Sequence, residues 1–211
     1  KHYTPSTTVL AVAGNYDVDQ LRELAEKHLG GWEAKPAPER EIWGETFVPS
    51  IVRREKDIEQ IHLCVAFPGV PMGSDDIYPL SVLNNLFGGG MSSRLFQNIR
   101  EEKGLAYSVC SMNVFSSYSG FFSIYAGVSH DKAADALEAI KYELEALVRD
   151  GVTEAELAMA KEQVKSSYIF GLESVNSRMF SIGKSKLLTD RIKSPEEVLK
   201  AFDSVTRNDI T

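Results

Sequence analysis

Cysteine is scarce in this sequence, where only Cys64 and Cys110 occur. Two cysteines are too few for a disulfide scaffold or for a cysteine-based structural zinc site. Both fall within predicted strands, so we expect buried free thiols in a reducing compartment. We therefore expect a bacterial cytoplasmic location, with an organellar matrix as the alternative.

Long apolar runs and an excess of positive charge are also missing. No apolar run reaches the roughly 20 residues that a helix needs to cross a bilayer, which excludes a membrane span. Lys and Arg number 23 against 30 Asp and Glu, and the net charge of −7 argues against a nucleic-acid partner. There is no signal peptide, although a targeting segment could precede Lys1. The 43% of hydrophobic residues still allow a substantial core.

The most distinctive stretch runs from Leu86 to Val109 and begins with three consecutive glycines, Gly88, Gly89 and Gly90. Glycines stop a helix and accept backbone angles that residues with a Cβ avoid. Ser92 or Ser93 can then cap a short helix, because a hydroxyl satisfies one of its first N–H groups. Gly104 is expected to end this helix and a strand to follow from Leu105. We expect the glycine turn to have a structural role and to line a cavity.

Two polar side chains stand out in this stretch. Arg100 lies near the helix end and Tyr107 near the strand start, so a tight turn can bring both to one side. A guanidinium fork and a phenol are good partners for a peptide carbonyl or a developing oxyanion. The spacing alone favours a simpler interpretation, a C-terminal helix Arg that interacts with the dipole and a packed strand Tyr, since neither residue needs a ligand to be explained.

The stretch resembles the signature of the C-terminal half of the M16 zinc metallopeptidases, the insulinase, pitrilysin and mitochondrial-processing-peptidase family. In that family a Gly-rich turn, a Ser-Ser-Arg-Leu helix and an Arg-x6-Tyr pair recur. Arg100 and Tyr107 match the pair residue by residue. The resemblance implies that Arg100 binds and orients the substrate and that Tyr107 donates to the scissile carbonyl as it becomes an oxyanion.

The zinc motif of the M16 family, His-x-x-Glu-His, is missing from this sequence. Its histidines are His2, His28, His62 and His130, and none has another histidine four residues away. We therefore expect no metal site in this chain and no peptidase activity from it alone. The resemblance implies that zinc is bound by an N-terminal half that is absent here.

The resemblance leaves two functional hypotheses open. In the first, the chain is the substrate-binding half of an M16 metalloendopeptidase of the processing-protease type, which cleaves extended peptides. In the second, it is a non-catalytic M16 subunit that acts in binding or assembly, or supplies the Arg/Tyr pair to a zinc-bearing partner. The partners implied are the zinc-bearing half, a peptide substrate and a homo- or heterodimer of the full-length protein. A domain without any site is the third reading.

The hydrophobic periodicity predicts an α+β fold, an antiparallel, mixed-edge sheet with helices on one face, as in an M16 metallohydrolase-like half. Ser116–Gly120 is expected to join the last two strands as a hairpin, and Thr153 with Glu156 to form a capping box. Alternation of apolar residues directs one side of the strand at 60–67 inward. Apolar residues at helical spacing predict inward faces for the helices at 17–29, 131–150 and 176–188, with Leu137, Ile140 and Leu147 on the second of these. The predicted strands and helices follow in chain order. Strands are expected at Thr7–Ala13, Phe47–Glu55, Gln60–Phe67, Ala106–Phe115 and Phe121–Val128, and helices at 17–29, 74–87, 131–150, 153–172, 176–188 and from Pro195.

These elements suggest three parts of the chain. Residues 1–34 resemble the strand–helix tail of the first, zinc-bearing half, and the proline-containing residues 35–45 read as a linker. Residues 46–211 form the M16 C-terminal-type domain, without the final strand that the family would lead us to expect. One further hypothesis places the strand ending at Ala13 on the sheet edge that this missing strand would fill.

Overall fold

The computed structural model of the chain describes residues 3–34 and 47–210. The chain divides into two compact units, one of Lys1–Gly44 and Ser167–Ser194 and the other of Glu45–Ser166 and Pro195–Thr211. The predicted linker, 35–45, lies outside the described residues. The predicted division into three parts stays a prediction.

Two complete α-helices lie in the first unit. Helix α1, Val18–Leu29, begins as predicted at Asp17, whose side chain accepts a 2.8 Å hydrogen bond from the Gln20 amide. Helix α5, Val175–Thr189, begins at Ser174, which caps the Ser177 amide in the same way. Neither helix buries any of its residues, so the inward faces predicted for them are not realised in this structure.

The second unit is built on a three-stranded antiparallel sheet in the order β1-β3-β2. The strands are β1, Ile61–Pro68, β2, Ser108–Phe115, and β3, Gly120–Val128. The predicted hairpin is confirmed, because β2 and β3 pair along their whole length from Ser108↔Gly127 to Phe115↔Gly120. The alternation predicted for β1 also holds and directs Ile61 and Leu63 toward the core.

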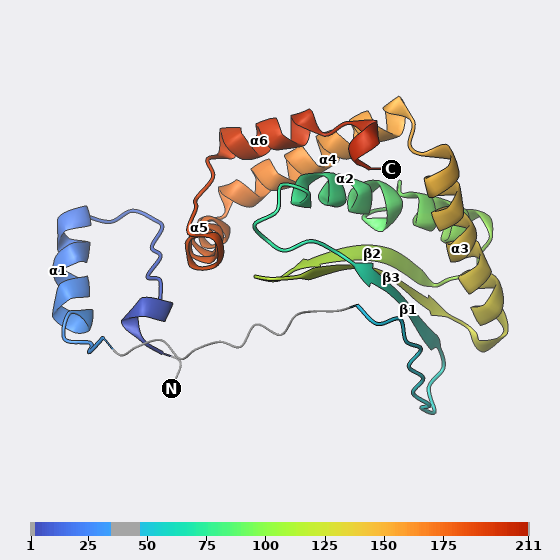
Figure 1. Cartoon of the computed structure of the whole chain (residues 1–211), viewed down its shortest axis with the longest axis horizontal. Coiled ribbons are helices and arrows are strands. Elements are labelled where there is room, and N and C mark those ends of the chain that lie inside the picture. Colours follow the sequence, from blue (N-terminus) through green and yellow to red (C-terminus); the bar gives the residue numbers. More distant parts are fainter. Residues whose placement is uncertain (1–2, 35–46, 211) are drawn as a thin grey trace. The chain divides into compact units, whose positions relative to one another are not determined.

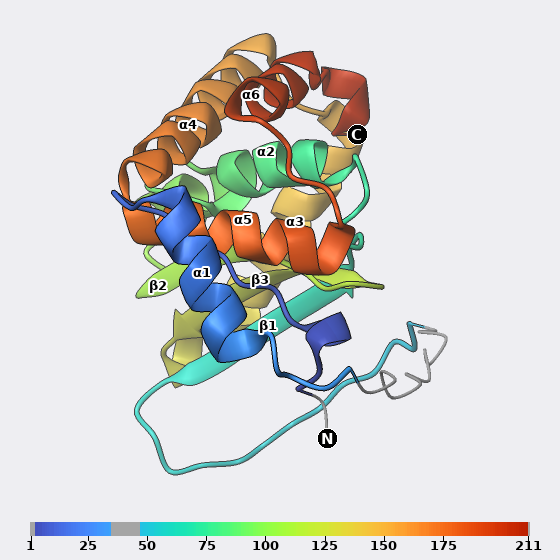
Figure 2. The same cartoon turned by 90° about the vertical axis from the view of Figure 1, so that its left-hand side faces the viewer.

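Helices cover one face of this sheet, which confirms the predicted fold class. Helix α2, Ile77–Gly88, lies on the sheet, and α6, Pro195–Ser204, lies beyond α2 (Figures 1 and 2). Tyr78 of α2 meets Phe202 of α6 edge to face, with ring centroids 5.1 Å apart. Helix α3, Ala133–Asp150, lies beside one end of the sheet, and α4, Glu154–Glu173, follows it. The core contains fully buried Val82, Phe87, Leu95, Ile99 and Ile124.

Two predicted strands do not form. Residues 8–13 follow a short 3-10 turn, Pro5–Thr7, and form no strand, and residues 47–55 have no regular secondary structure. All three strands of the sheet in the described part of the chain come from residues 61–128. The edge-strand hypothesis, which also allows a neighbouring chain, stays a prediction. A strand needs a neighbour for its backbone hydrogen bonds, and β-propensity cannot replace it. Ile51 is accordingly 99% exposed.

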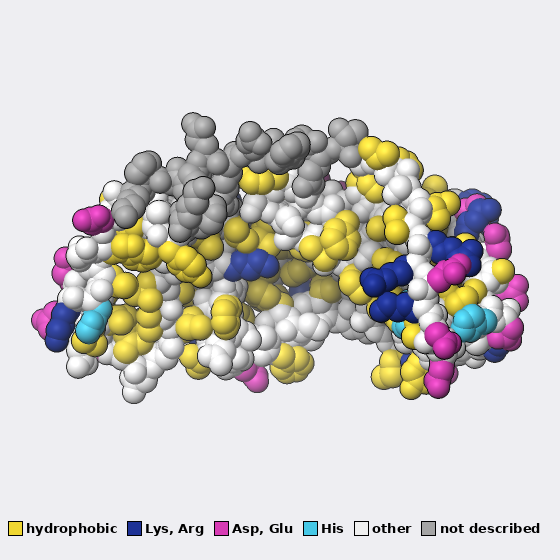
Figure 3. Space-filling view, turned by 90° about the horizontal axis from the view of Figure 1, so that it is seen from below, with side chains coloured by type: hydrophobic (Ala, Val, Ile, Leu, Met, Phe, Trp, Pro, Cys, Tyr) yellow, Lys and Arg dark blue, Asp and Glu magenta, His cyan; other side chains and the backbone are white. Residues whose placement is uncertain are grey.

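The opposite face of the sheet carries the residues that alternate with the core positions. Cys64 and Cys110 lie on this face, each paired with Tyr125 of the central strand. Two strand spacings, about 10 Å, therefore separate them, which is too far for a disulfide. Both thiols are free as predicted, but Cys64 is exposed rather than buried. Figure 3 views the molecule from this side and shows hydrophobic side chains at the surface.

The described helices lack an apolar stretch that could extend through a lipid bilayer. The longest of them, α4, carries acidic residues in its first turn and has only two buried residues, Leu157 and Ala160.

The contact between α2 and β2 depends on Gly88. A Cβ on Gly88 would lie 2.4 Å from the Ser111 amide nitrogen, so the backbones approach too closely for any side chain. Ser111 and Asn113 of β2 in turn donate hydrogen bonds to the Asn84 and Leu80 carbonyls of α2. By contrast, a Cβ on Gly90 would meet nothing within 4 Å.

We predict that Gly88→Ala destabilises the protein by about 1–3 kcal/mol. The added Cβ would meet the backbone of Ser111, which cannot move aside as a flexible side chain could. Gly90→Ala is the matched control two residues away and should change stability by less than about 1 kcal/mol. Urea denaturation of the two variants measures the difference. Equal stability of the two variants would contradict the role assigned to Gly88.

Candidate functional site

The signature stretch forms an unusual helix after the glycine turn. Arg94 and Leu95 begin a helical turn that continues as a π-helix, η2, Phe96–Glu102. Ser93 directly precedes this turn, as predicted, and its carbonyl accepts a 3.0 Å hydrogen bond from the Gln97 amide. Its hydroxyl, however, donates to the Gly90 carbonyl. π-helices are rare and occur frequently at functional sites, which draws attention to this segment.

The structure brings Arg100 and Tyr107 together. The guanidinium carbon of Arg100 lies 4.7 Å from the Phe96 ring centroid and 5.9 Å from that of Tyr107, within the range of cation–π attraction. The Arg100 side chain is 40% exposed and Tyr107 is 75% exposed. Glu101 Oε1 lies 3.9 Å from Arg100 Nε, which is too long for a hydrogen bond. The aromatic rings therefore orient the guanidinium while its charge stays accessible.

The turn between these two residues is held from several sides. Gly104 adopts a φ of +58°, which favours glycine, and its carbonyl accepts a 2.8 Å hydrogen bond from Lys132 Nζ. The Leu105 amide donates to the Ile99 carbonyl, and the Tyr107 amide donates to Gly127 of β3, each over 2.9 Å. Tyr107 thus precedes β2, which begins at Ser108 rather than at Leu105 as predicted.

A shallow cavity of about 380 Å³ opens beside Tyr107. Its walls combine charged, polar and apolar groups and so could accept a segment of peptide. They comprise Glu59, Gln60, Gly104, Leu105, Ala106, Tyr107, Ser129 and Lys132. Gly88, Gly89 and Gly90 do not line this cavity, so a cavity-lining role for the glycine turn stays a prediction.

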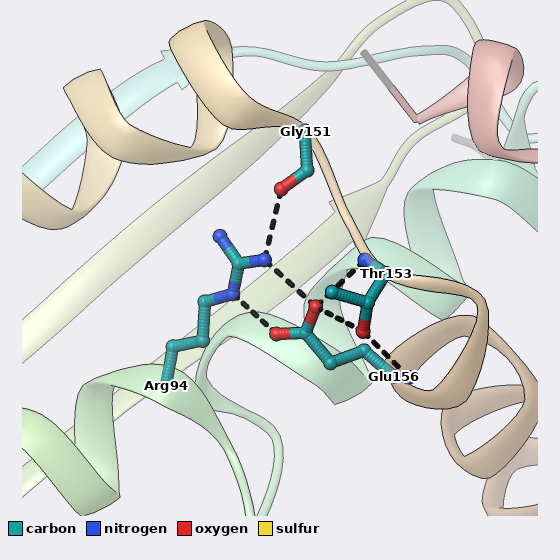
Figure 4. Close-up of polar contacts among 4 residues, drawn as sticks. All are labelled: Arg94, Gly151, Thr153 and Glu156. Atoms are coloured by element: carbon teal, nitrogen blue, oxygen red, sulfur yellow. Dashed lines mark hydrogen bonds and ion pairs between the residues drawn. The ribbon is translucent and has the colours of Figure 1, made fainter.

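Arg94, at the start of the same helix, makes the most extensive polar contact near the site (Figure 4). Its Nε and Nη2 donate to the two carboxylate oxygens of Glu156 over 2.7 and 2.9 Å, and Nη2 also donates to the Gly151 carbonyl over 2.9 Å. Glu156 and Thr153 form the predicted capping box of α4. The side chains of Arg94 and Glu156 are only 17% and 27% exposed.

This network stabilises the charged form of Glu156. The hydrogen bond from Arg94 is the largest influence and, with the bonds from Thr153, lowers the pKa of Glu156 from 4.5 to about 2, although partial burial acts in the opposite direction. The guanidinium also lies at the C-terminal end of α3, where the helix dipole favours a cation, while Glu156 lies in the first turn of α4, where it favours an anion.

Sequence reasoning identified Arg100 and Tyr107 but missed the residues that support them. Phe96 and Arg100 are four residues apart on one helix, a spacing that could have suggested their contact. No local signal links Arg94 to Glu156, which is 62 residues further along the chain.

The described residues do not fit a zinc site. His28 belongs to α1, His62 shares a 2.7 Å hydrogen bond with Tyr125 on the sheet, and His130 lies in a short 3-10 turn before α3. Among residues 3–34 and 47–210, no three His, Cys, Asp or Glu side chains gather as metal ligands would. Any zinc-dependent step would therefore need ligands from elsewhere.

Comparison with known proteins identifies relatives of this chain. Residues 1–164 match a family model described as "Peptidase M16 inactive domain". The chain is 41% identical over 204 residues to "Uncharacterized zinc protease YmxG" of Bacillus subtilis, covering 97% of this chain and 49% of that protein. It is 36% identical over 214 residues to "Uncharacterized zinc protease Rv2782c" of Mycobacterium tuberculosis, covering 100% of this chain and again 49% of the relative. The chain thus spans about half the length of these relatives.

Solved structures share the fold. A protease from Helicobacter pylori aligns with a TM-score of 0.78 and 22% identity, over 94% of this chain and 49% of that one. A chain of complex III from Candida albicans aligns with a TM-score of 0.81 and 24% identity, over 93% of this chain and 49% of that one. At these identities the likeness concerns the fold alone.

We predict that Glu156→Gln lowers the free energy of unfolding by about 2 kcal/mol at about pH 7, because charged hydrogen bonds are lost while the capping box can persist. The Glu156 pKa is about 2 in the folded chain and 4.5 without these contacts. Its stabilisation is therefore complete above pH 4.5 and is lost as the pH falls toward 2.

Urea denaturation at a series of pH values tests this, with Glu145→Gln on the exposed side of α3 as the control. The difference between wild type and Glu156→Gln should shrink across the acid range, while the control stays within about 0.5 kcal/mol of wild type. A difference that does not change with pH would contradict the role of the Glu156 charge.

Proposed function

Because the chain belongs to the peptidase M16 inactive-domain family, we propose that it is the substrate-binding C-terminal half of a zinc metalloendopeptidase. The whole protein would be of the processing-protease type and would cleave peptide bonds in extended peptides. The single observation that carries this proposal is the Arg100–Tyr107 pair, whose side chains lie together at one accessible site, with the guanidinium carbon 5.9 Å from the phenol ring centroid.

Each member of the pair has a distinct role. The Arg100 guanidinium binds a peptide carbonyl or carboxylate and so orients the substrate, a task for which its planar fork of donors is suited. The Tyr107 hydroxyl donates a hydrogen bond to the scissile carbonyl oxygen as negative charge develops on it. The exposure of Tyr107 and the adjacent cavity support access by a substrate.

The chain needs a partner to complete this activity. We propose that an N-terminal half carries the His-x-x-Glu-His motif and binds zinc, since the four histidines of this chain do not form that motif. Residues 1–34 would be the tail of that half, 35–45 the linker and 46–211 the C-terminal-type domain. The full-length protein would work as a homo- or heterodimer in the cytoplasm. In the alternative, a non-catalytic subunit, the same fold serves binding or assembly only.

We predict that this chain by itself binds no stoichiometric zinc and cleaves no peptide, and that mixing with the zinc-bearing half restores both. Metal analysis and cleavage of a fluorogenic extended peptide measure the two properties. Zinc bound tightly by this chain alone would refute the assignment of its histidines. A mixture that binds zinc but stays inactive would favour the non-catalytic subunit.

In the active mixture, we predict that Tyr107→Phe lowers kcat by about 10²–10³ with little change in KM, because its hydrogen bond strengthens only in the transition state. Arg100→Ala should mainly raise KM, since it removes a contact made already in the bound substrate. Both variants should keep their zinc content. An unchanged kcat for Tyr107→Phe would remove Tyr107 from the mechanism.

A further inference from the structure

We propose that Arg94 and Glu156 form a positioning device for the substrate-binding pair, because they hold the helix that places the Arg100 guanidinium beside Tyr107. This inference rests on the proposed function of Arg100 and Tyr107. Arg94 and Glu156 do not line the cavity or contact the pair directly. They act on Arg100 through η2, the helix that carries it.

Tyr107 and Arg100 are held by different elements, Tyr107 by the sheet and Arg100 by η2. Tyr107 is anchored to the sheet through its amide, which donates to the Gly127 carbonyl of β3. Arg100 belongs to η2, whose buried side chain Ile99 packs in the core. The spacing between guanidinium and phenol ring therefore depends on how η2 is placed against the sheet.

The helix that carries Arg100 has little intrinsic stability. π-type turns are rare and occur mostly as single turns inside α-helices, and the side chain of Leu95, the residue before η2, makes no capping hydrogen bond. At its C-terminal end, the Ile99 carbonyl and the following turn are tied down by Leu105 and Lys132. The position of its N-terminal end is fixed by the burial of Leu95 and by the hydrogen bonds of Arg94.

The bonds of Arg94 reach two helices at once. The Arg94 guanidinium binds the Glu156 carboxylate in the first turn of α4 (Figure 4). It also binds the carbonyl of Gly151, the residue that follows α3. These three bonds fix both the orientation of the Arg94 side chain and its distance from α3 and α4. The ammonium group of a lysine could not do so, because it lacks the planar fork of donors. The start of η2 is thereby locked to the α3–α4 junction.

Amide hydrogen exchange of the chain itself gives the first test. Glu156→Gln should speed exchange of the amides from Phe96 to Tyr107 by about tenfold, the effect expected from losing charged hydrogen bonds. Arg94→Lys should act in the same direction because lysine cannot bind both partners. Amides of β1 and β3 exchange through global unfolding, so their exchange should speed up only by the factor that the loss of overall stability in urea denaturation predicts.

Asp203→Asn is the matched control, because it breaks the 2.7 Å ion pair between Lys165 of α4 and Asp203 of α6 without touching η2. This variant should leave exchange between Phe96 and Tyr107 unchanged. Exchange between Phe96 and Tyr107 that is unchanged in Glu156→Gln would overturn the positioning role.

Kinetics of the complemented enzyme give the second test. Glu156→Gln should raise KM about three- to tenfold in the wild-type background and have no further effect on KM in the Arg100→Ala background, because it acts through Arg100. Effects that multiply in the double variant would show a merely structural role and overturn the inference.

The two tests also separate this inference from the proposed function. If Arg100→Ala leaves KM unchanged, the proposed role of Arg100 in substrate binding fails. The exchange measurement needs neither zinc nor substrate, and therefore decides independently whether Arg94 and Glu156 hold η2.

Discussion

The close approach of α2 to β2 at Gly88 is the constraint on which the second unit depends. It lets the helix lie directly on the sheet, so that Val82 and Phe87 are fully buried between the two layers. Ser111 is tolerated at this contact because its hydroxyl donates to a carbonyl of α2. The same glycine ends α2, and the chain that leaves it forms the helix of the candidate site. Packing of the core and placement of the site are therefore coupled at one residue.

The candidate site combines exposed polar side chains, which can bind a ligand, with a largely buried ion pair, which holds the helix that carries them. Arg100 stays accessible to solvent, so its charge keeps much of its hydration and carries no large desolvation penalty. Phe96 and Tyr107 orient the guanidinium by stacking, which leaves donors available for a ligand. Arg94, six residues earlier on the same helix, has the opposite environment. It is largely buried, and its Nε and Nη2 donate to Glu156 and Gly151, as is typical of a structural arginine.

Features that depend on neighbouring residues could be read from the sequence alone. The hairpin of β2 and β3 follows from alternation on both sides of a short turn, and the capping box of Thr153 and Glu156 follows from their spacing. Pro195 marks the first residue of α6 for the same kind of reason. The M16 resemblance likewise came from one continuous stretch, and the match to the family model confirms it. Arg100 and Tyr107 belong to that stretch, and the turn between them is short enough to predict their proximity.

Only the tertiary structure decided which segments find partners. Residues 47–55 include apolar residues with strand propensity, but they form no strand, because no strand of the described sheet pairs with them. On α3 the predicted inward residues Ile140 and Leu147 are buried. Leu137, predicted on the same face, is 44% exposed, while Glu143 is buried. The buried stripe of the helix is therefore rotated slightly from the one that apolar spacing predicts. Arg94 and Glu156 are brought together by the folding of the whole second unit. Local sequence encodes the propensity of each element, whereas strand pairing, helix rotation and long-range ion pairs depend on surfaces that exist only once the elements pack.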